Sequence, residues 1–404
     1  IFAQNPEYSA KLDSLINAKD KVPFKIFDKK NAEKLFGKNL NISASQLEKF
    51  NLCRFSYFCN YGLNVRERQR AEINPMQYGT IVHYILERFF GEYTKEEYLS
   101  LEEDKFQKIV CAYLAEYAVK YFGEEQLESN SFTYRLKTIL DNVMYLMKHI
   151  MEELSQSEFF VADCELKIGE DIPSYTIVLP DGHKIAVCGS VDRVDIMQRA
   201  DITYLRIIDY KTGTKQFKLS DILYGINLQM LLYLHSIEAS GGDKYGEIVP
   251  AGILYMPATV PYISSDSLKS IDKLPDELNK KLKMNGLLLK DTEIIHGMDK
   301  TDVATYIPVK IKAGEPVSST SLATLAEFGK IFKKVDMLIA EMGKNIYNGN
   351  IEAKPLKGGH DSCEYCPYDS VCAYRQSNPI TCFSVDNKTV IEEITNEING
   401  KEEE

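Results

Sequence analysis

The sequence contains no apolar run long enough to span a bilayer and no signal peptide, so we expect neither a membrane-spanning nor a secreted protein. It has no G-x-x-x-x-G-K-[ST] loop, which excludes the phosphate-binding loop of many ATP-hydrolysing motors. Acidic residues outnumber basic ones, 59 to 48, and the net charge of −11 argues against a protein that simply coats DNA. An enzyme with a local basic groove, or with a partner that supplies the basic surface, remains possible.

Cysteines are too few and too scattered for a disulfide framework. There are nine, an odd number, in 404 residues, which fits a reducing cytosol. A hydrophobic content of 44% and a charged content of 26% indicate a globular chain with a real core. The length suggests one large elaborated domain or two fused units. The chain begins IFAQNPEYSA without a Met, so we expect a piece of a longer or processed polypeptide.

Apolar periodicity divides the chain into helical ends and a strand-rich middle. Residues 1–40 lack strong periodicity and are interpreted as an arm or the end of a preceding domain. Ser43, with Gln46 three residues later, predicts a capped helix. Further helices are expected over 76–91, 101–155, 220–240 and 318–348, and strands over 159–169, 175–180, 183–196, 204–211 and 249–258.

This order of helices, strands, helix and strand predicts an α/β core wrapped in additional helices. The helix after the strands is expected to open at Ser220 as its cap. Residues 261–317 are irregular with some β character. Residues 379–404 are rich in Asn and Glu and end in NGKEEE, so we expect a disordered tail.

A hairpin in the middle of the chain brings two carboxylates together. GSVDRVDI and YLRIIDYK flank the polar turn MQRADIT, which predicts an antiparallel pair. If the turn centres between Ala200 and Asp201, residues paired across it have numbers that add to 401. Asp192 and Asp209 then face each other, with Lys211 two residues further on the same face. A slip of one residue would move Asp192 to the opposite face.

Two carboxylates and an ammonium in this arrangement suit phosphodiester cleavage. The carboxylates of Asp192 and Asp209 offer hard oxygen ligands for Mg²⁺ or Mn²⁺, which can lower the pKa of a bound water. The ammonium of Lys211 can orient that water or offset negative charge in the transition state. The competing interpretation is a structural ion pair at the end of a strand. For a D-x-K motif that occurs without other site residues, this structural interpretation is usually the correct one.

Other polar residues near these strands have both a functional and a structural interpretation. Gln229 and Tyr233 share one face of the following helix and could contact the metal site and a base or sugar, or form an ordinary polar face. His83, one helical turn from Glu87 in GTIVHYILERF, could ligate the metal or be a buried core histidine. Glu165 lies in the strand before the site and could support the metal or face solvent.

A short cysteine run near the C-terminus predicts a metal or cluster site. SCEYCPYDSVC places Cys363, Cys366 and Cys372 in a C-x₂-C-x₅-C pattern, whose tight turn can converge three thiolates. No second C-x₂-C pair exists, so the fourth ligand must be remote, and zinc and iron–sulfur both remain possible. The candidates for the fourth ligand are Cys53, Cys59, Cys111, Cys164, Cys188 and Cys382, of which Cys164 and Cys188 are expected in the core.

These motifs together resemble a known family. GSVDRVD, IIDYKTG and LQMLLY resemble the PD-(D/E)XK nuclease superfamily in its RecB-like branch. With NLCRFSYFCNYGL and CEYCPYDSVC, residues 41–378 resemble the C-terminal nuclease part of the AddB family of helicase–nuclease subunits. The resemblance implies a restriction-endonuclease-like α/β fold, with a mixed central sheet flanked by helices. It also implies that residues 1–40 end a helicase-like region.

The resemblance also implies roles for particular residues. Asp192, Asp209 and His83 match the metal-binding positions of the family. Lys211 matches the motif lysine, and Gln229 and Tyr233 match the motif on the following helix. The ligands of a [4Fe–4S] cluster match Cys53, Cys363, Cys366 and Cys372, which leaves Cys59 outside the set. The family often has Pro directly after the first cysteine, whereas this chain has Arg54. A bridge from Cys53 to Cys363 closes a loop of about 310 residues. A cross-link of this length indicates a structural role, in which the cluster holds the N-terminal helices against the C-terminal end.

The implied function is a Mg²⁺-dependent nuclease domain that cuts single-stranded DNA delivered by an AddA-like motor in the cytoplasm. The stretch RFSYFCNYGLNVRERQR, residues 54–70, is basic and aromatic and could contact the strand, or could be an exposed helix end. Two alternatives remain. One is a stand-alone nuclease similar to CRISPR-associated adaptation nucleases, and the other is a non-catalytic DNA-binding scaffold.

Overall fold

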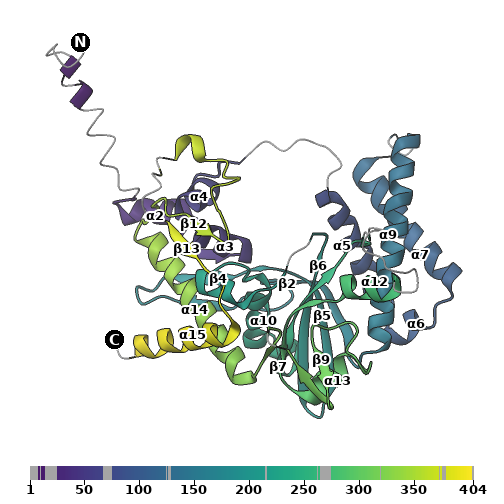
Figure 1. Ribbon diagram of the computed structural model, residues 1–404. Helices are drawn as coiled ribbons and strands as arrows, with labels where there is room; N and C mark the ends of the chain where they lie inside the picture. The colour runs from purple at the N-terminus through teal and green to yellow at the C-terminus, as the bar shows by residue number, and fades with distance from the viewer. Residues whose placement is uncertain are drawn as a thin grey trace.

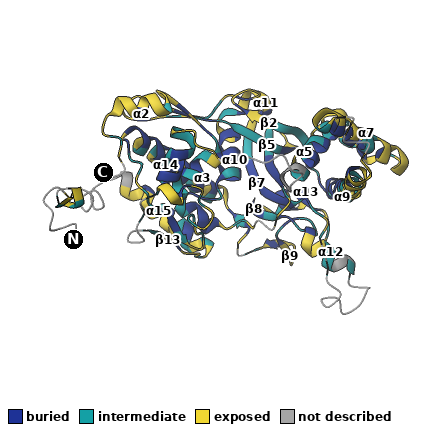
Figure 2. Cartoon of the chain, turned by 90° about the horizontal axis from the view of Figure 1, so that it is seen from above, coloured by how far each residue is buried: buried dark blue, intermediate teal, exposed yellow. Residues whose placement is uncertain are grey.

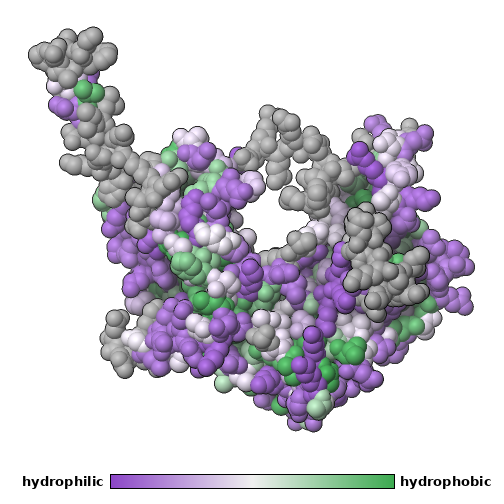
Figure 3. Space-filling model, viewed as in Figure 1, coloured by the Kyte–Doolittle hydropathy of each residue, from purple (hydrophilic) through white to green (hydrophobic). Residues whose placement is uncertain are grey.

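The computed structural model describes most of the chain, and its elements are arranged around one large sheet (Figure 1). The described residues are 8–9, 11–13, 25–66, 75–123, 125, 129–213, 216–261, 263, 274–318, 320–372, 374 and 379–402. None of the helices within these ranges is long and apolar enough to cross a membrane. In the space-filling view, polar residues cover most of the coloured surface (Figure 3).

The central sheet has six strands in the order β11-β8-β7-β6-β5-β2. Pairing is antiparallel for β2 with β5, β5 with β6 and β7 with β8, and parallel for β6 with β7 and β8 with β11, so the sheet is mixed as predicted. The strands are β2 (Phe160–Ile168), β5 (Gly189–Arg199), β6 (Ile202–Lys211), β7 (Glu247–Pro257), β8 (Asn285–Leu289) and β11 (Leu322–Ala323).

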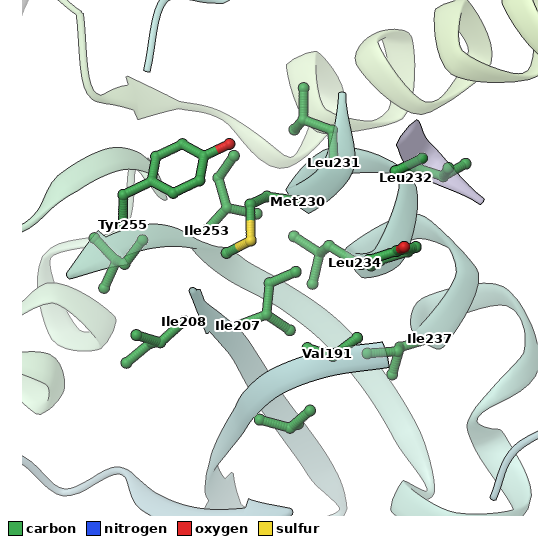
Figure 4. Close-up of a cluster of buried hydrophobic side chains, with 14 of the residues drawn as sticks. Val191, Ile207, Ile208, Met230, Leu231, Leu232, Leu234, Ile237, Ile253 and Tyr255 are labelled. Carbon is green, nitrogen blue, oxygen red and sulfur yellow. The ribbon is translucent and has the colours of Figure 1, made fainter. Parts of the chain in front are cut away.

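Helices cover both faces of this sheet (Figures 1 and 2). Helix α10 (Gln229–Ser240) packs on β6 and β7, where Met230 and Leu234 lie against Ile207 and Ile253 (Figure 4). Helices α5 (Pro75–Glu92), α6 (Lys95–Leu99), α7 (Glu103–Phe122) and α9 (Asn130–Ser155) gather on the other side. Every one of these helices buries apolar side chains, which is the packing of helices on both faces of a sheet that an α/β core shows.

A second group of elements lies beside the sheet. Strands β1 (Asn39–Ile42), β4 (Lys184–Val187) and β3 (Thr176–Val178) form a small sheet, and β12 (Leu356–Gly358) pairs with β13 (Ile380–Cys382). The predicted cap at Ser43 is confirmed, because Ser43 and Gln46 form a capping box on α3 (Ala44–Leu52). The remaining elements here are α2 (Lys29–Phe36), α4 (Arg54–Tyr57), the π-helix η2 (Phe58–Gly62), α14 (Leu325–Tyr347), η6 (Asp369–Val371) and α15 (Asn387–Glu402).

The irregular appearance of residues 261–317 reflects several short elements. They are α12 (Leu274–Leu282), β8, α13 (Thr292–Met298), β9 (Lys310–Lys312) and β10 (Glu315–Val317). Within residues 261–317 the described chain therefore adds one strand, β8, to the main sheet and a short β9–β10 hairpin. Helix α11 (Gly242–Tyr245) makes the short connection from α10 into β7.

Two expectations from the sequence are wrong. Ser220 does not cap α10, because residues 219–224 form the 3₁₀ segment η3 (Leu219–Tyr224) and α10 begins only at Gln229. The tail is not disordered over 387–402, because α15 packs on α14 through Val390, Ile394 and Ile398. These residues recur every four positions, so the polar composition concealed one apolar helical face.

The predicted hairpin register is confirmed. The pairs run from Arg193↔Ile208 to Arg199↔Ile202, so their numbers add to 401. The next step in the same register places Asp192 opposite Asp209. Ala200 occupies the turn with a positive φ of 49°. Because side chains alternate between faces, Asp192 and Asp209 point away from the face that carries Arg193.

The face opposite the carboxylates holds a fully buried charge network. Arg193 and Arg206 contact both Asp195 of β5 and Glu153 of α9, with N···O distances of 2.6 to 3.0 Å. All four side chains are 0% exposed. Two positive and two negative charges therefore neutralise one another away from the surface, and Arg193 also reaches the Tyr210 hydroxyl at 3.4 Å. The network ties α9 to the β5–β6 pair.

Removing one member of this network should destabilise the fold strongly. We expect Glu153→Ala to cost about 3–5 kcal/mol of unfolding free energy, because two buried guanidinium groups lose a counter-charge. Urea unfolding followed by circular dichroism measures the change. Glu152→Ala is the matched control, since Glu152 is the exposed neighbour on the same helix and should cost within about 0.5 kcal/mol. Equal effects of the two substitutions would contradict a structural role for the network.

Candidate active site

Asp192, Asp209 and Lys211 meet at the end of the β5–β6 pair. Asp209 is only 2% exposed, and its Oδ2 lies 2.5 Å from the Lys211 ammonium. Asp192 Oδ2 accepts a hydrogen bond of 3.0 Å from the backbone N–H of Tyr210. Burial, and then the neighbouring Asp209 carboxylate, raise the pKa of Asp192 to about 7. The three residues that the sequence placed together are therefore neighbours in the structure.

His83 reaches this cluster from α5. Its Nε2 lies 3.6 Å from Asp192 Oδ2, and its Nδ1 lies 2.8 Å from Glu165 Oε1. The imidazole packs edge-on against Tyr210, with ring centroids 5.8 Å apart. Burial opposes the charged imidazole, but the carboxylates of Glu165, Asp192 and Asp209 raise the His83 pKa overall. His83 is thus part of the site, whereas Glu87, one turn further along α5, is exposed.

Glu165 of β2 completes the contacts of His83. Its Oε2 accepts a hydrogen bond of 2.8 Å from Ser190 Oγ of β5. Despite the burial of Glu165, these hydrogen bonds lower the pKa of its carboxyl group. The pairs Cys164↔Arg193 and Leu166↔Val191 place Glu165 opposite Asp192 on the neighbouring strand. Sequence reasoning left its role open because the β2–β5 register is not set by a short turn.

The two predicted residues of α10 occupy different environments. Gln229 is the first residue of the helix and half-buried, and its backbone N–H lies 3.3 Å from Glu48 Oε1. Glu48 Oε1 also accepts from the backbone N–H of Leu228 at 2.8 Å, so α3 holds the start of α10. Tyr233 is buried behind the site and packs onto Gly189, and burial raises its pKa to about 12.

The expected nucleic-acid contact patch is corrected at three of its described positions, whereas its Arg66 is exposed. Phe55 and Tyr57 are buried, so they cannot stack on bases at the surface. Arg54 lies 3.5 Å from Glu341 and over the ring of Phe50, which engages it within the protein. Residues 67–70 of the patch lie outside the described residues.

The donor set of the site fits a hard divalent cation. One ligand atom each from His83, Glu165 and Asp192 lies within 4.8 Å of the others. The Asp209 carboxylate follows in register on the strand beside Asp192. Carboxylate oxygens with one imidazole suit Mg²⁺ or Mn²⁺. A cation here would also offset the like-charge repulsion between Asp192 and Asp209.

Four cysteines from the two ends of the chain line one cavity. Cys53 ends α3, whereas Cys363, Cys366 and Cys372 lie in the segment around η6, and all four border a cavity of about 140 Å³. The apolar parts of Phe55, Ala353 and Pro355 contribute to its walls. Several thiols around one apolar pocket are the kind of donor set that a metal or cluster site uses. The four cysteines that the sequence grouped therefore border the same cavity.

Cys59, which sequence reasoning set aside, belongs to the same buried cluster of side chains as Cys53 and Tyr368. Burial, and then the thiols of Cys372, Cys366 and Cys53, raise the pKa of Cys59. Cys59 is not among the residues that border the cavity. The other cysteines, Cys111, Cys164, Cys188 and Cys382, lie elsewhere in the fold.

Comparison with known proteins gives one family and a consistent set of relatives. The family model described as the PD-(D/E)XK nuclease superfamily matches residues 41–373. A relative named as the B-type subunit of an ATP-dependent helicase/deoxyribonuclease occurs in Clostridium kluyveri, 35% identical over 94% of this chain and 34% of the relative. The protein of the same name from Ruminiclostridium cellulolyticum is 33% identical over 95% of this chain and 34% of the relative. The one from Thermoanaerobacter sp. X514 is 34% identical over 85% of this chain and 30% of the relative. The chain spans about a third of the length of these curated relatives.

The packing of Tyr233 of α10 onto Gly189 of β5 can be tested by substitution. A Cβ at Gly189 would lie 2.2 Å from Tyr233 Oη, so we expect Gly189→Ala to cost about 1–3 kcal/mol of unfolding free energy by overpacking. Urea unfolding measures this cost. In a Tyr233→Leu background the same substitution should cost clearly less, because the two sites are in contact. Additive effects would show that Tyr233 does not pack where the structure places it.

Proposed function

The chain belongs to the PD-(D/E)XK nuclease superfamily, as its motifs predicted, and on this premise we propose a metal-dependent nuclease domain that cuts single-stranded DNA. The observation that supports this proposal most directly is the meeting of Asp192, Asp209, Lys211 and His83 at one end of the sheet. A structural ion pair would explain Asp209 with Lys211. It would not explain the second, half-buried carboxylate of Asp192 and an imidazole beside them.

Each of these side chains has a distinct task in the proposed reaction. Asp192, Asp209 and His83 would hold Mg²⁺ or Mn²⁺, which supplies an activated water and offsets charge on the phosphodiester. The Lys211 ammonium, 2.5 Å from Asp209, would orient the attacking water and stabilise negative charge that develops on the phosphate oxygens. Burial of Asp209 lowers the local dielectric, which strengthens each of these interactions.

The names of the relatives extend the proposal to a larger assembly. We propose that this chain serves as the nuclease part of an AddAB-type helicase–nuclease, with an AddA-like protein as its partner. The motor would deliver single-stranded ends during the processing of DNA double-strand breaks for recombinational repair. A net charge of −11 fits an enzyme that receives DNA from a partner. The free cysteines fit a reducing cytoplasm.

The four cysteines around the cavity are the proposed ligands of a [4Fe–4S] cluster. Cys53 lies at the end of α3, and Cys363, Cys366 and Cys372 follow α14. A cluster held by all four would join segments about 310 residues apart, and this closure would stabilise the fold. The cavity lies outside the carboxylate site, so its proposed role is structural.

The nuclease proposal predicts metal-dependent cleavage that depends on Asp209. We expect labelled single-stranded DNA to be cut with Mg²⁺ and to stay intact with EDTA. Asp209→Ala should lower the rate by about 100-fold or more, because the site supplies several kcal/mol of charge stabilisation. Asp201→Ala, in the exposed hairpin turn, is the matched control and should retain activity.

If the intact protein does not cut, the assay is repeated with an AddA-like partner. Cleavage that appears only with the partner, and that Asp209→Ala abolishes, supports the assembly. DNA binding without cleavage under either condition would favour a non-catalytic scaffold and contradict the nuclease proposal.

The cluster proposal predicts a coloured protein. Anaerobically purified chain should show a broad visible absorbance band, and Cys363→Ser should lose it together with bound iron. Cys111→Ser, at a half-buried site on α7, should keep both. A colourless protein that carries stoichiometric zinc would refute the iron–sulfur assignment.

A further inference from the structure

We propose that a lysine-rich groove beside the candidate active site binds the sugar–phosphate backbone of the single-stranded DNA that reaches this site. The groove has a volume of about 590 Å³, and the described residues that line it include four lysines and no carboxylate. These residues are Lys280, Lys283, Met284, Pro308, Val309, Lys310, Lys312, Val317 and Ser318. This binding role rests on the nuclease function proposed above, because it concerns the same substrate.

The groove begins at the end of the sheet that carries the candidate active site. Asp209 of β6 pairs with Tyr255 of β7, and Tyr255 pairs with Asn285 of β8. Paired residues point to the same face and neighbouring strands lie about 4.8 Å apart, so Asn285 lies about 10 Å from Asp209 along this row. Lys283 and Met284 directly precede Asn285 and line the groove. A strand that is cut at Asp209 would therefore pass within reach of the groove.

The lysines of the groove have different environments. Lys310 and Lys312 belong to β9, are exposed, and form no ion pair with any described residue, so they carry the proposed phosphate contacts. Lys283 is a structural lysine, because its Nζ donates to the backbone carbonyls of Ala304 at 2.6 Å and Val309 at 3.0 Å. These bonds hold the segment before β9 against the end of α12, and the two elements are neighbours in Figure 2.

Two carboxylates near the groove have partners of their own. Glu277 of α12 lies 2.7 Å from Lys280 Nζ, which partly neutralises that lysine. Glu315 is paired with Lys312 across the β9–β10 hairpin, but its Oε2 accepts from Thr292 Oγ1 at 2.8 Å. Neither carboxylate is among the described residues of the groove, so positive charge prevails inside it. Excess positive charge is what the binding of a phosphate backbone requires.

The β9–β10 hairpin fixes the spacing of the two exposed lysines. Its two turn residues, Ala313 and Gly314, have positive φ values of 50° and 84°, which is the pattern of a type I′ turn. Lys310 and Lys312 are two residues apart on one strand, so they point to the same face about 7 Å from each other. This spacing is close to the separation of successive phosphates in an extended single strand.

The described lining of the groove predicts binding without base selectivity. It contains no aromatic side chain on which a base could stack, and its apolar part consists of Met284, Pro308, Val309 and Val317. Contacts to phosphates position a strand but carry no sequence information. We therefore expect the groove to hold single-stranded DNA of any sequence.

The experiment measures the affinity of the whole chain for labelled oligodeoxythymidine and oligodeoxyadenosine by fluorescence anisotropy, in EDTA so that no strand is cut. We expect Lys310→Ala combined with Lys312→Ala to weaken the binding of both strands by about tenfold. The slope of log affinity against log salt concentration should become shallower by about 1.4, because each lost phosphate contact on a single strand contributes about 0.7.

The matched control combines Lys105→Ala with Lys108→Ala, which removes the same charge from exposed positions of α7. It should change neither the affinity nor the salt slope. Circular dichroism verifies that both double variants fold. In the cleavage assay, the Lys310/Lys312 variant should raise KM and leave kcat unchanged, because the groove lies away from the reacting phosphate.

The outcomes separate this inference from the nuclease proposal. Equal affinities of the two double variants would overturn it, and so would a wild-type chain that binds neither strand. Loss of binding to an AddA-like protein, with preserved affinity for DNA, would assign the groove to a protein partner and overturn it as well. Lysine-dependent binding by a chain that cuts no DNA, alone or with its partner, would contradict the nuclease proposal and leave the groove assigned.

Discussion

The β5–β6 register is the constraint on which the site depends, and the buried charge network is what holds it. A slip of one residue would separate Arg206 of β6 from Asp195 of β5, and both side chains are 0% exposed. Such a slip would leave uncompensated buried charges, so the cost would far exceed that of ordinary strand displacement. The same register places Asp192 opposite Asp209 on the other face. One face of the hairpin thus fixes the geometry of the other.

The two faces differ in how well their charges are balanced. On the network face, two guanidinium groups meet two carboxylates at hydrogen-bond distance. On the site face, Asp192 and Asp209 stand together with one ammonium and one imidazole, and the pKa of Asp192 rises to about 7. A folded protein seldom keeps a poorly compensated buried carboxylate pair for stability alone. The imbalance therefore supports the proposal that this face receives a cation and a phosphate.

Local signals decided how much could be predicted from the sequence. The hairpin turn is short, so counting from it gave the correct facing of Asp192 and Asp209. Glu165 could not be assigned this way, because β2 reaches β5 through a distant connection with a register shift between Val161 and Asp163. Its left-handed backbone, with a φ of 51°, has no sequence signature either. The packing of α15 was missed because single apolar residues every four positions are hidden in a polar composition.

The cysteine cluster and the candidate active site are linked through one short helix. Cys53 terminates α3, and Glu48, five residues earlier on that helix, accepts hydrogen bonds from the backbone N–H groups of Leu228 and Gln229. These bonds fix the start of α10, whose packing on β6 and β7 supports the strands that carry the carboxylates. A cluster bound at Cys53 would restrain α3 and, through Glu48, the position of α10. Loss of the cluster would then weaken the support that α10 gives to the strands of the site, while the side chains of the site stay in place. A structural cofactor can in this way affect catalysis without taking part in it.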